Sequence, residues 1–144
     1  MTGVEADDSF GRYKPWFYAA ALYNLVWGAV NVLLPNLLFD LIGIERPVNS
    51  ALWQVVGMFV LVYAPAYWWA ARNPLQHRHL ILIGFLGKVL GPIGFAWSAL
   101  SGQLPLAFGW INLTNDLIWW PAFALFLRDA SRVSGGVKAM VMGE

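Results

Sequence analysis

Cysteine is absent from the 144 residues of this chain, and charged residues make up only 12% of them. Without a thiol the chain has no disulfide, no thiolate nucleophile and no cysteine ligand for zinc or an iron–sulfur cluster. An ordinary soluble domain is about 25% charged, so this composition excludes that class. The formal net charge of +1 also gives no basic surface for nucleic acid.

Histidine is nearly absent as well. The only two, His77 and His79, stand in the loop ARNPLQHRH with no cysteine or carboxylate beside them. Two imidazoles make an incomplete metal site, and a basic cluster at a membrane surface accounts for them better. We therefore expect no metal site, and no motif in the chain points to a bound cofactor.

Hydrophobic residues, in contrast, make up 59% of the chain and fall into four long runs. About 20 apolar residues in a helix cross a hydrocarbon core of about 30 Å, so each run is long enough to span a membrane. The sequence predicts an all-α integral membrane protein, an antiparallel four-helix bundle with spans at about 15–38, 51–71, 80–100 and 105–127. Polar segments flank it, at the N-terminus (1–14) and in a C-terminal tail (128–144).

The third and fourth runs each hold one charge, Lys88 and Asp116. Both lie 14 residues from Gly102 in the turn between them, so an antiparallel pair of helices places them at the same depth. An isolated charge at mid-membrane costs about 2.5–3.5 kcal/mol. We therefore expect Lys88 and Asp116 to be direct or water-bridged partners, in a chiefly structural role.

Glycines form a stripe on the third run, at positions 84, 87, 91 and 94, with Ser98 extending it. Such a face lets another helix approach closely, and we expect the first or second span to cover it. A flat cofactor or a lipid tail in the groove is the alternative. Pro92 should interrupt the helical hydrogen bonds near Lys88.

Polar side chains on the first and fourth runs complete the candidate site. Asn24, Gly28 and Asn31 share one face of the first span, and an amide without a partner in hydrocarbon is costly, so this face should be turned toward protein. The candidate ligand-binding or functional polar cluster is Asn24, Lys88, Asn112, Asn115, Asp116 and Trp119. Packing and hydrogen bonding between helices is the simpler interpretation, and no residue is assigned a catalytic role.

Basic residues outside the spans are distributed unevenly. Seven fall on one side (Arg12, Lys14, Arg72, Arg78, Arg128, Arg132 and Lys138) and one, Arg46, on the other. Because basic loops stay in the cytoplasm, we expect a multi-pass protein of the plasma membrane with both termini cytoplasmic.

Three stretches carry a resemblance to a known family: WGAVNVLLPNLLFDLIGI, then LWQVVGMFVLVYAPAYWWAARNP, then a glycine-rich helix and a turn ending in GQLP. Over about residues 23–127 the chain resembles the DoxX-like small membrane proteins. The resemblance implies a four-helix bundle and is compatible with association with quinone-linked redox enzymes. It transfers no catalytic motif.

Three functions are compatible with these features. The first is a non-catalytic bundle that serves as an accessory or anchoring subunit of a larger membrane assembly, such as a redox complex, with a membrane protein or a second copy as partner. The second is a small membrane enzyme or redox protein that binds a quinone or lipid-like ligand in a polar intramembrane pocket. The third is a proton-coupled carrier of small molecules. Whether the chain is an enzyme stays open at this point.

Overall fold

A computed structural model describes residues 9–142, and this part of the chain is helical, without strands. Three of its helices are long and apolar enough to cross a membrane, which indicates a membrane protein. They are α2 (Lys14–Leu33), which continues the 3-10 turn η1 (Gly11–Tyr13), α4 (Ser50–Arg72) and α5 (Arg78–Leu100).

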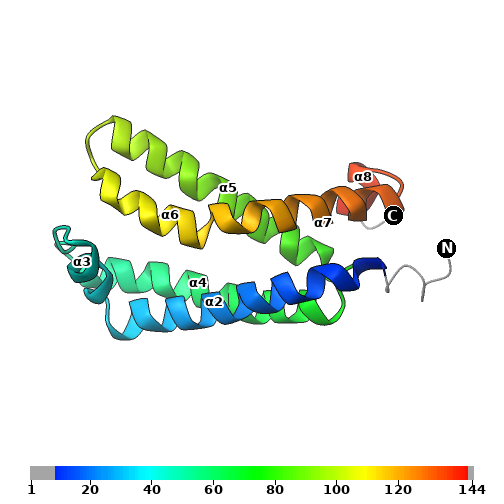
Figure 1. Ribbon diagram of the computed structural model, residues 1–144, viewed down its shortest axis with the longest axis horizontal. Helices are drawn as coiled ribbons and strands as arrows, with labels where there is room; N and C mark the ends of the chain where they lie inside the picture. Colours follow the sequence, from blue (N-terminus) through cyan, green and yellow to red (C-terminus); the bar gives the residue numbers. More distant parts are fainter. Residues whose placement is uncertain (1–8, 143–144) are drawn as a thin grey trace.

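Shorter elements make up the rest of the described chain. They are α3 (Leu37–Ile42), η2 (Leu106–Phe108), α6 (Gly109–Asn115), η3 (Leu117–Trp119), α7 (Trp120–Val133) and α8 (Val137–Met142). In Figure 1, α2 lies beside α4, while α5 lies beside the series α6–η3–α7. The start of α2 and the end of α7 lie at the same end, with α3 at the other.

The second and third predicted spans correspond closely to α4 and α5, whereas the first, 15–38, runs past the end of α2 at Leu33 into α3. Local residues bound two of these helices: Leu34 leaves helical geometry before Pro35, and the side chain of Asn49 caps the start of α4 by accepting a hydrogen bond from the Ala51 N–H (3.0 Å). The fourth predicted span, 105–127, differs: it is divided among η2, α6, η3 and α7 instead of forming one helix.

Close packing joins α2 to α4 through two glycines. A Cβ added at Gly28 would lie 2.9 Å from the Gly57 carbonyl oxygen, and one at Gly57 would lie 3.1 Å from the Gly28 carbonyl oxygen. Without side chains the two backbones can meet directly. The face predicted to contact protein does so, because Asn24, Gly28 and Asn31 are all buried.

An aromatic core lies at the end where α2 begins. Phe17 packs edge-to-face on Phe123 and Phe126, with ring centroids 5.6 and 5.0 Å away. Phe10 and Tyr13 join this core, although both belong to the segment 1–14 that was predicted to be a polar extension. Residues 1–8 of that segment lie outside the described range. Residues 9–14 instead begin the first helical unit, because two large aromatic side chains gain more by burial than by exposure.

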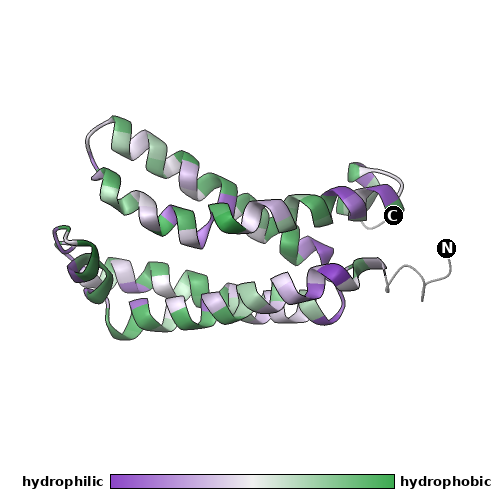
Figure 2. Cartoon of the chain, in the orientation of Figure 1, coloured by the Kyte–Doolittle hydropathy of each residue, from purple (hydrophilic) through white to green (hydrophobic). Residues whose placement is uncertain are grey.

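The C-terminal segment also differs from the polar tail predicted at 128–144. The helix α7 continues to Val133, and α8 folds back so that Met140 is buried in the core. Arg78 Nε donates to the Met140 carbonyl oxygen at 3.1 Å, which ties this segment to the start of α5. In Figure 2, hydrophilic residues gather at this end and again where α6 meets η3, inside the apolar body.

Candidate functional site: a polar pocket where the fourth segment breaks

The break in the fourth segment is centred on Asp116, whose dihedral angles (φ −122°, ψ −63°) are not helical. Thr114, Asn115 and Asp116 all have short polar side chains that compete for backbone hydrogen bonds and weaken a helix. Pro121 then lies in the first turn of α7, where its missing N–H cannot extend the preceding helix. The run Thr-Asn-Asp followed by Pro121 is a breaking signal that the hydropathy-based prediction of one span did not use.

Two side chains donate to carbonyl groups that the break releases, those of Asn115 and Thr114. Lys88 Nζ donates to the Asn115 carbonyl oxygen at 2.5 Å, and Trp119 Nε1 donates to the Thr114 carbonyl oxygen at 3.1 Å. Irregular backbone at membrane depth is tolerated only when such groups have partners. Lys88 also places its positive charge at the C-terminal end of α6, where the helix dipole is negative.

Pro92 has a similar compensation in α5. The proline has no N–H for the carbonyl of Lys88, four residues earlier, and Trp120 Nε1 donates to that oxygen instead, at 2.9 Å. Pro92 therefore removes one bond, as predicted, but α5 continues through it from Arg78 to Leu100.

Asp116 lies close against α5. Asn115 Nδ2 donates to its Oδ1 at 2.9 Å, and a Cβ added at Gly91 would lie 2.7 Å from its Oδ2. The predicted direct contact with Lys88 is not present, since the ion pairs found among residues 9–142 involve only Arg12, Arg46, Arg128 and Arg132. A backbone carbonyl, not the carboxylate, is the partner of the ammonium group. Water-bridged pairing stays a prediction.

Lys88 and Asp116 nevertheless share a cavity of about 230 Å³. The cavity is lined by residues of α2, α4, α5 and the break: Asn24, Val56, Phe59, Val60, Tyr63, Tyr67, Gly84, Gly87, Lys88, Asn115 and Asp116. We call this the polar pocket. Its polar groups come from elements far apart in the sequence, while Val56 and Phe59 extend it to the exposed apolar surface.

Asn24 has an unusual hydrogen-bonding state. The residue is 3% exposed, and its Nδ2 donates to the Val60 carbonyl oxygen at 3.3 Å. Its Oδ1 is buried without a hydrogen-bond partner, and so is Oδ1 of Asn115. A buried acceptor left unsatisfied costs about 1–3 kcal/mol, so two of them at one cavity require an explanation.

Four of the six predicted site residues line the polar pocket: Asn24, Lys88, Asn115 and Asp116. Asn112 is buried outside it, and Trp119 acts through its bond to Thr114.

Tyr63 and Tyr67 also line the polar pocket, although neither was predicted as a site residue. In number of residues, Tyr63 is about as far before the loop joining α4 to α5 as Lys88 is after it, and Tyr67 is similarly matched with Gly84. The comparison by depth that paired Lys88 with Asp116 could therefore have found them.

The glycine stripe of α5 is covered only in part. Tyr67 of α4 lies over Gly84, where an added Cβ would come within 2.6 Å of its ring carbon Cε1, and Asp116 lies over Gly91. An added Cβ at Gly87 or Gly94 would meet nothing within 4 Å. The second span thus covers one glycine, as predicted, and Gly87 faces the polar pocket instead of a helix.

The two histidines lie at the start of α5, and neither of them lines the polar pocket. His79 Nε2 is 3.2 Å from the Val141 carbonyl oxygen, so this ring contacts the α8 backbone. Within residues 9–142 no three side chains of the metal-binding types are grouped.

The residues that line the polar pocket thus carry two acceptor oxygens without a hydrogen-bond partner, a carboxylate, an ammonium group and the side chain of Tyr67, with apolar residues around them. No protein-family model matches the chain, and no curated protein or solved structure is significantly similar to it.

Proposed function

We propose that this protein is a membrane bundle that binds a small lipid-soluble molecule in the polar pocket. The observation that carries the proposal is the buried Asn24 Oδ1, which has no hydrogen-bond partner and belongs to a residue that lines a cavity of about 230 Å³. A hydroxyl or amide N–H of a ligand would give this oxygen its missing hydrogen bond.

The lining of the pocket defines the ligand further. The Asn24 and Asn115 oxygens require donors, whereas Lys88 can donate through hydrogens not used on Asn115. One cation and one anion give the pocket no net formal charge, which favours a neutral head group. Val56, Phe59 and Val60 favour an apolar remainder. A quinone-like molecule in its reduced, hydroxyl-bearing form meets this description, as does a lipid with a small hydroxyl head.

A four-helix antiparallel bundle is part of this proposal. The series α6–η3–α7 follows the turn after α5 and lies beside it, and the Thr114 and Asn115 carbonyls of its break accept hydrogen bonds from side chains. These bonds remove the main objection to a broken segment in hydrocarbon, so we infer that the series completes the crossing as the fourth span.

Blocking the pocket tests the proposal. Gly87→Leu directs a side chain into it, and a Cβ there meets no atom within 4 Å, so folding should be preserved. We expect the wild-type protein, purified in mild detergent, to carry a lipid-like molecule detectable by mass spectrometry, and Gly87→Leu to lose it without a change in melting temperature. Asn112→Ala, at a buried amide outside the pocket, is the control and should keep the molecule.

Equal amounts of the same molecule in wild type and Gly87→Leu would contradict binding in this pocket, and so would a wild-type protein with no bound molecule. An accessory or anchoring subunit, a DoxX-like assembly and a location in the plasma membrane stay predictions. A stoichiometric protein partner in the same purification would support the first of them.

A further inference from the structure

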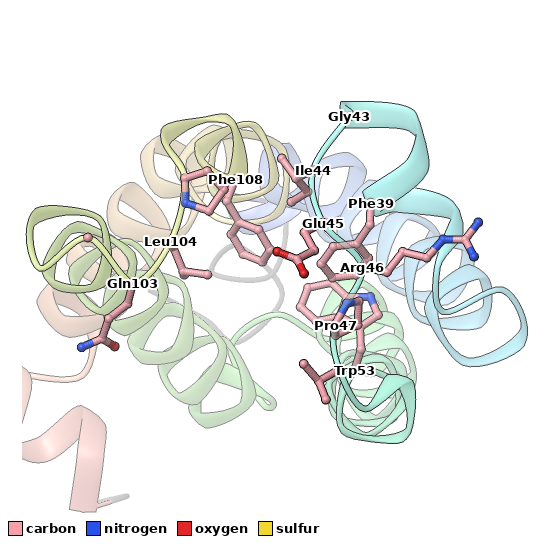
Figure 3. A pocket seen from close by; sticks show the side chains of 13 residues that line it. Phe39, Gly43, Ile44, Glu45, Arg46, Pro47, Trp53, Gln103, Leu104 and Phe108 are labelled. Atoms are coloured by element: carbon pink, nitrogen blue, oxygen red, sulfur yellow. The ribbon is translucent and has the colours of Figure 1, made fainter.

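A second, larger cavity of about 810 Å³ lies at the end of the molecule where α3 is found. The connector between α3 and α4 forms one side of it, and the turn between α5 and η2 forms the other (Figure 3). We call it the end pocket. It shares no lining residue with the polar pocket, so a ligand of the end pocket is independent of the lipid-soluble molecule proposed for the polar pocket.

Three aromatic rings form one wall of the end pocket. The centroids of Phe39 and Trp53 are 5.0 Å apart, and those of Trp53 and Phe108 are 5.7 Å apart, with the rings edge-to-face in both pairs. Trp53 is held in place because its Nε1 donates to Asn31 Oδ1 at 2.5 Å. The aromatic wall is therefore preformed in the absence of a ligand.

A carboxylate without an ionic partner lies beside this wall. Figure 3 shows Glu45 directed between the Phe108 and Phe39 rings, whereas Arg46 is directed away. Arg46 is occupied by Asp40, with Nε and Nη2 bonds of 2.6 and 2.8 Å. None of the ion pairs found within residues 9–142 involves Glu45.

The formal charge of this end of the molecule can be counted along the chain. Between Leu34 and Asn49 the charged residues are Asp40, Glu45 and Arg46, and residues 101–108 add none. Because Arg46 balances Asp40, the carboxylate of Glu45 remains as the net charge of the pocket.

We propose that the end pocket binds an organic ammonium cation of the quaternary type. Aromatic faces attract cations through the negative charge of their π-systems, and a neighbouring carboxylate adds direct attraction. A methylated ammonium is weakly hydrated and apolar at its surface, which suits a wall of Phe39, Trp53 and Phe108. A divalent metal ion is a poor fit, since it requires several oxygen ligands.

Choline tests this chemistry directly. Its neutral isostere 3,3-dimethylbutan-1-ol has the same shape without the charge, so isothermal titration of the detergent-solubilised protein with both compounds isolates the contribution of the cation. We expect choline to bind and the alcohol to bind at least about fivefold more weakly. Equal binding of the two compounds, or no binding of choline, would overturn the proposal.

Variants locate the site. Glu45→Gln and Phe108→Leu should each weaken choline binding by about fivefold, because one removes the charge and the other the aromatic face while keeping its bulk. Gln103→Ala is the control and should bind as wild type does, because Figure 3 shows the Gln103 side chain directed away from the three rings. If Glu45→Gln and Phe108→Leu both bind choline normally with unchanged melting temperatures, the cation does not sit in this pocket.

The cation could be a free molecule or the head group of a lipid, and bilayer nanodiscs separate these sources. If phosphatidylcholine occupies the pocket, choline added to phosphatidylcholine nanodiscs should bind more weakly than choline added to phosphatidylglycerol nanodiscs. Equal affinity in both supports a free cation as the ligand. Absence of binding in both would contradict the proposal in the membrane setting.

Discussion

Lys88 Nζ lies 2.5 Å from the backbone carbonyl oxygen of Asn115, so the single charge in the middle of α5 closes the end of α6. This contact changes what the removal of either charge should do. The ammonium group replaces a helical hydrogen bond, and its loss leaves a buried carbonyl unsatisfied whether or not Asp116 is present.

Replacement of Lys88 should therefore be the more damaging change. We expect Lys88→Met to lower the free energy of unfolding by about 1–3 kcal/mol, and Asp116→Asn to lower it less, because an amide oxygen still accepts from Asn115. Thermal melting in one detergent measures both. The double variant should remain damaged, because Asn115 still lacks its donor, and full recovery in the double variant would show that charge pairing is the dominant interaction.

Two glycines of α5, one turn apart, should respond differently to alanine. Gly91→Ala would place a Cβ 2.7 Å from Asp116 Oδ2, so we expect a loss of about 1–3 kcal/mol in the free energy of unfolding. Gly87→Ala meets nothing within 4 Å and should be neutral or gain up to about 1 kcal/mol from helix propensity. Equal melting temperatures for the two variants would mean that Asp116 does not lie over Gly91.

Trp120 and Pro92 should be energetically coupled. Trp120→Phe removes the donor to the Lys88 carbonyl and should cost about 1 kcal/mol. In a Pro92→Ala background the alanine N–H can donate to that same oxygen, so the cost of Trp120→Phe should fall there. A double-mutant cycle of melting temperatures measures the coupling. Strict additivity would show that the indole bond and the missing proline N–H are unrelated.

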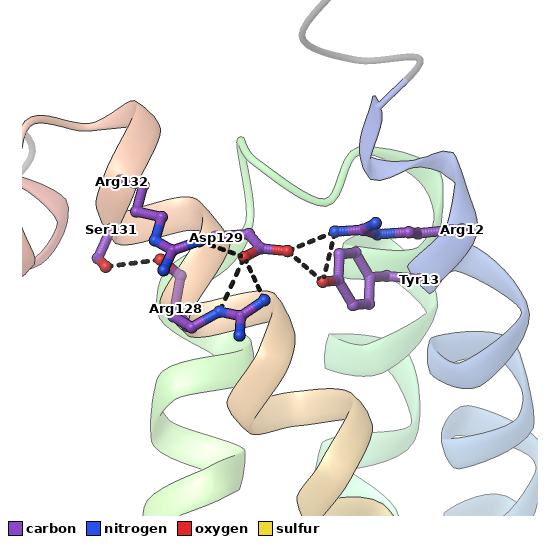
Figure 4. Close-up of polar contacts among 6 residues, drawn as sticks. All are labelled: Arg12, Tyr13, Arg128, Asp129, Ser131 and Arg132. Carbon is purple, nitrogen blue, oxygen red and sulfur yellow. Dashed lines mark hydrogen bonds and ion pairs between the residues drawn. The ribbon is translucent and has the colours of Figure 1, made fainter.

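Asp129 should make stability depend on pH at the end where α2 begins. It accepts hydrogen bonds from the Tyr13 hydroxyl at 2.6 Å, from Arg128 Nε at 3.0 Å and from Arg12 (Figure 4). The bond from Tyr13, followed by those from Arg128 and Arg12, holds the pKa of the Asp129 carboxyl below its ordinary value.

Because that pKa is lower in the folded state, the stabilisation is fully present above the unfolded value of about 3.9 and is lost as the pH falls through the folded value. We expect Asp129→Asn to melt below wild type at neutral pH, with the difference shrinking under acid conditions near about pH 3. A difference of the same size at both pH values would show that the carboxylate charge is not what stabilises this contact.

Topology can be tested by single cysteines, since the natural chain has none. Ser101→Cys in the turn after α5 should react with a membrane-impermeant maleimide in sealed cells. Gln76→Cys, in the loop before α5, should react only after permeabilisation, because the basic residues place that loop in the cytoplasm. The reverse pattern would invert the orientation.

Much of the fold could be predicted from local signals. Apolar length and breakers such as Pro35 and Asn49 were enough to locate α2, α4 and α5, because a helix in hydrocarbon is limited by hydropathy and by interruptions in the same short stretch of chain. Their equal distance from the turn at Gly102 also predicted that Lys88 and Asp116 lie near each other, because the rise of a helix converts sequence separation into distance along its axis.

Other features depended on which groups the tertiary structure placed within reach. Lys88 donates to a carbonyl oxygen because the break at Asp116 frees one near its ammonium group. The hydropathy pattern does not predict this partner. Phe10 and Met140 are buried because other helices supply a surface for them. Hydropathy and spacing alone therefore predicted a helical membrane protein with Lys88 and Asp116 near each other. The tertiary structure decided their partners, because a hydrogen bond requires two specific atoms at contact distance.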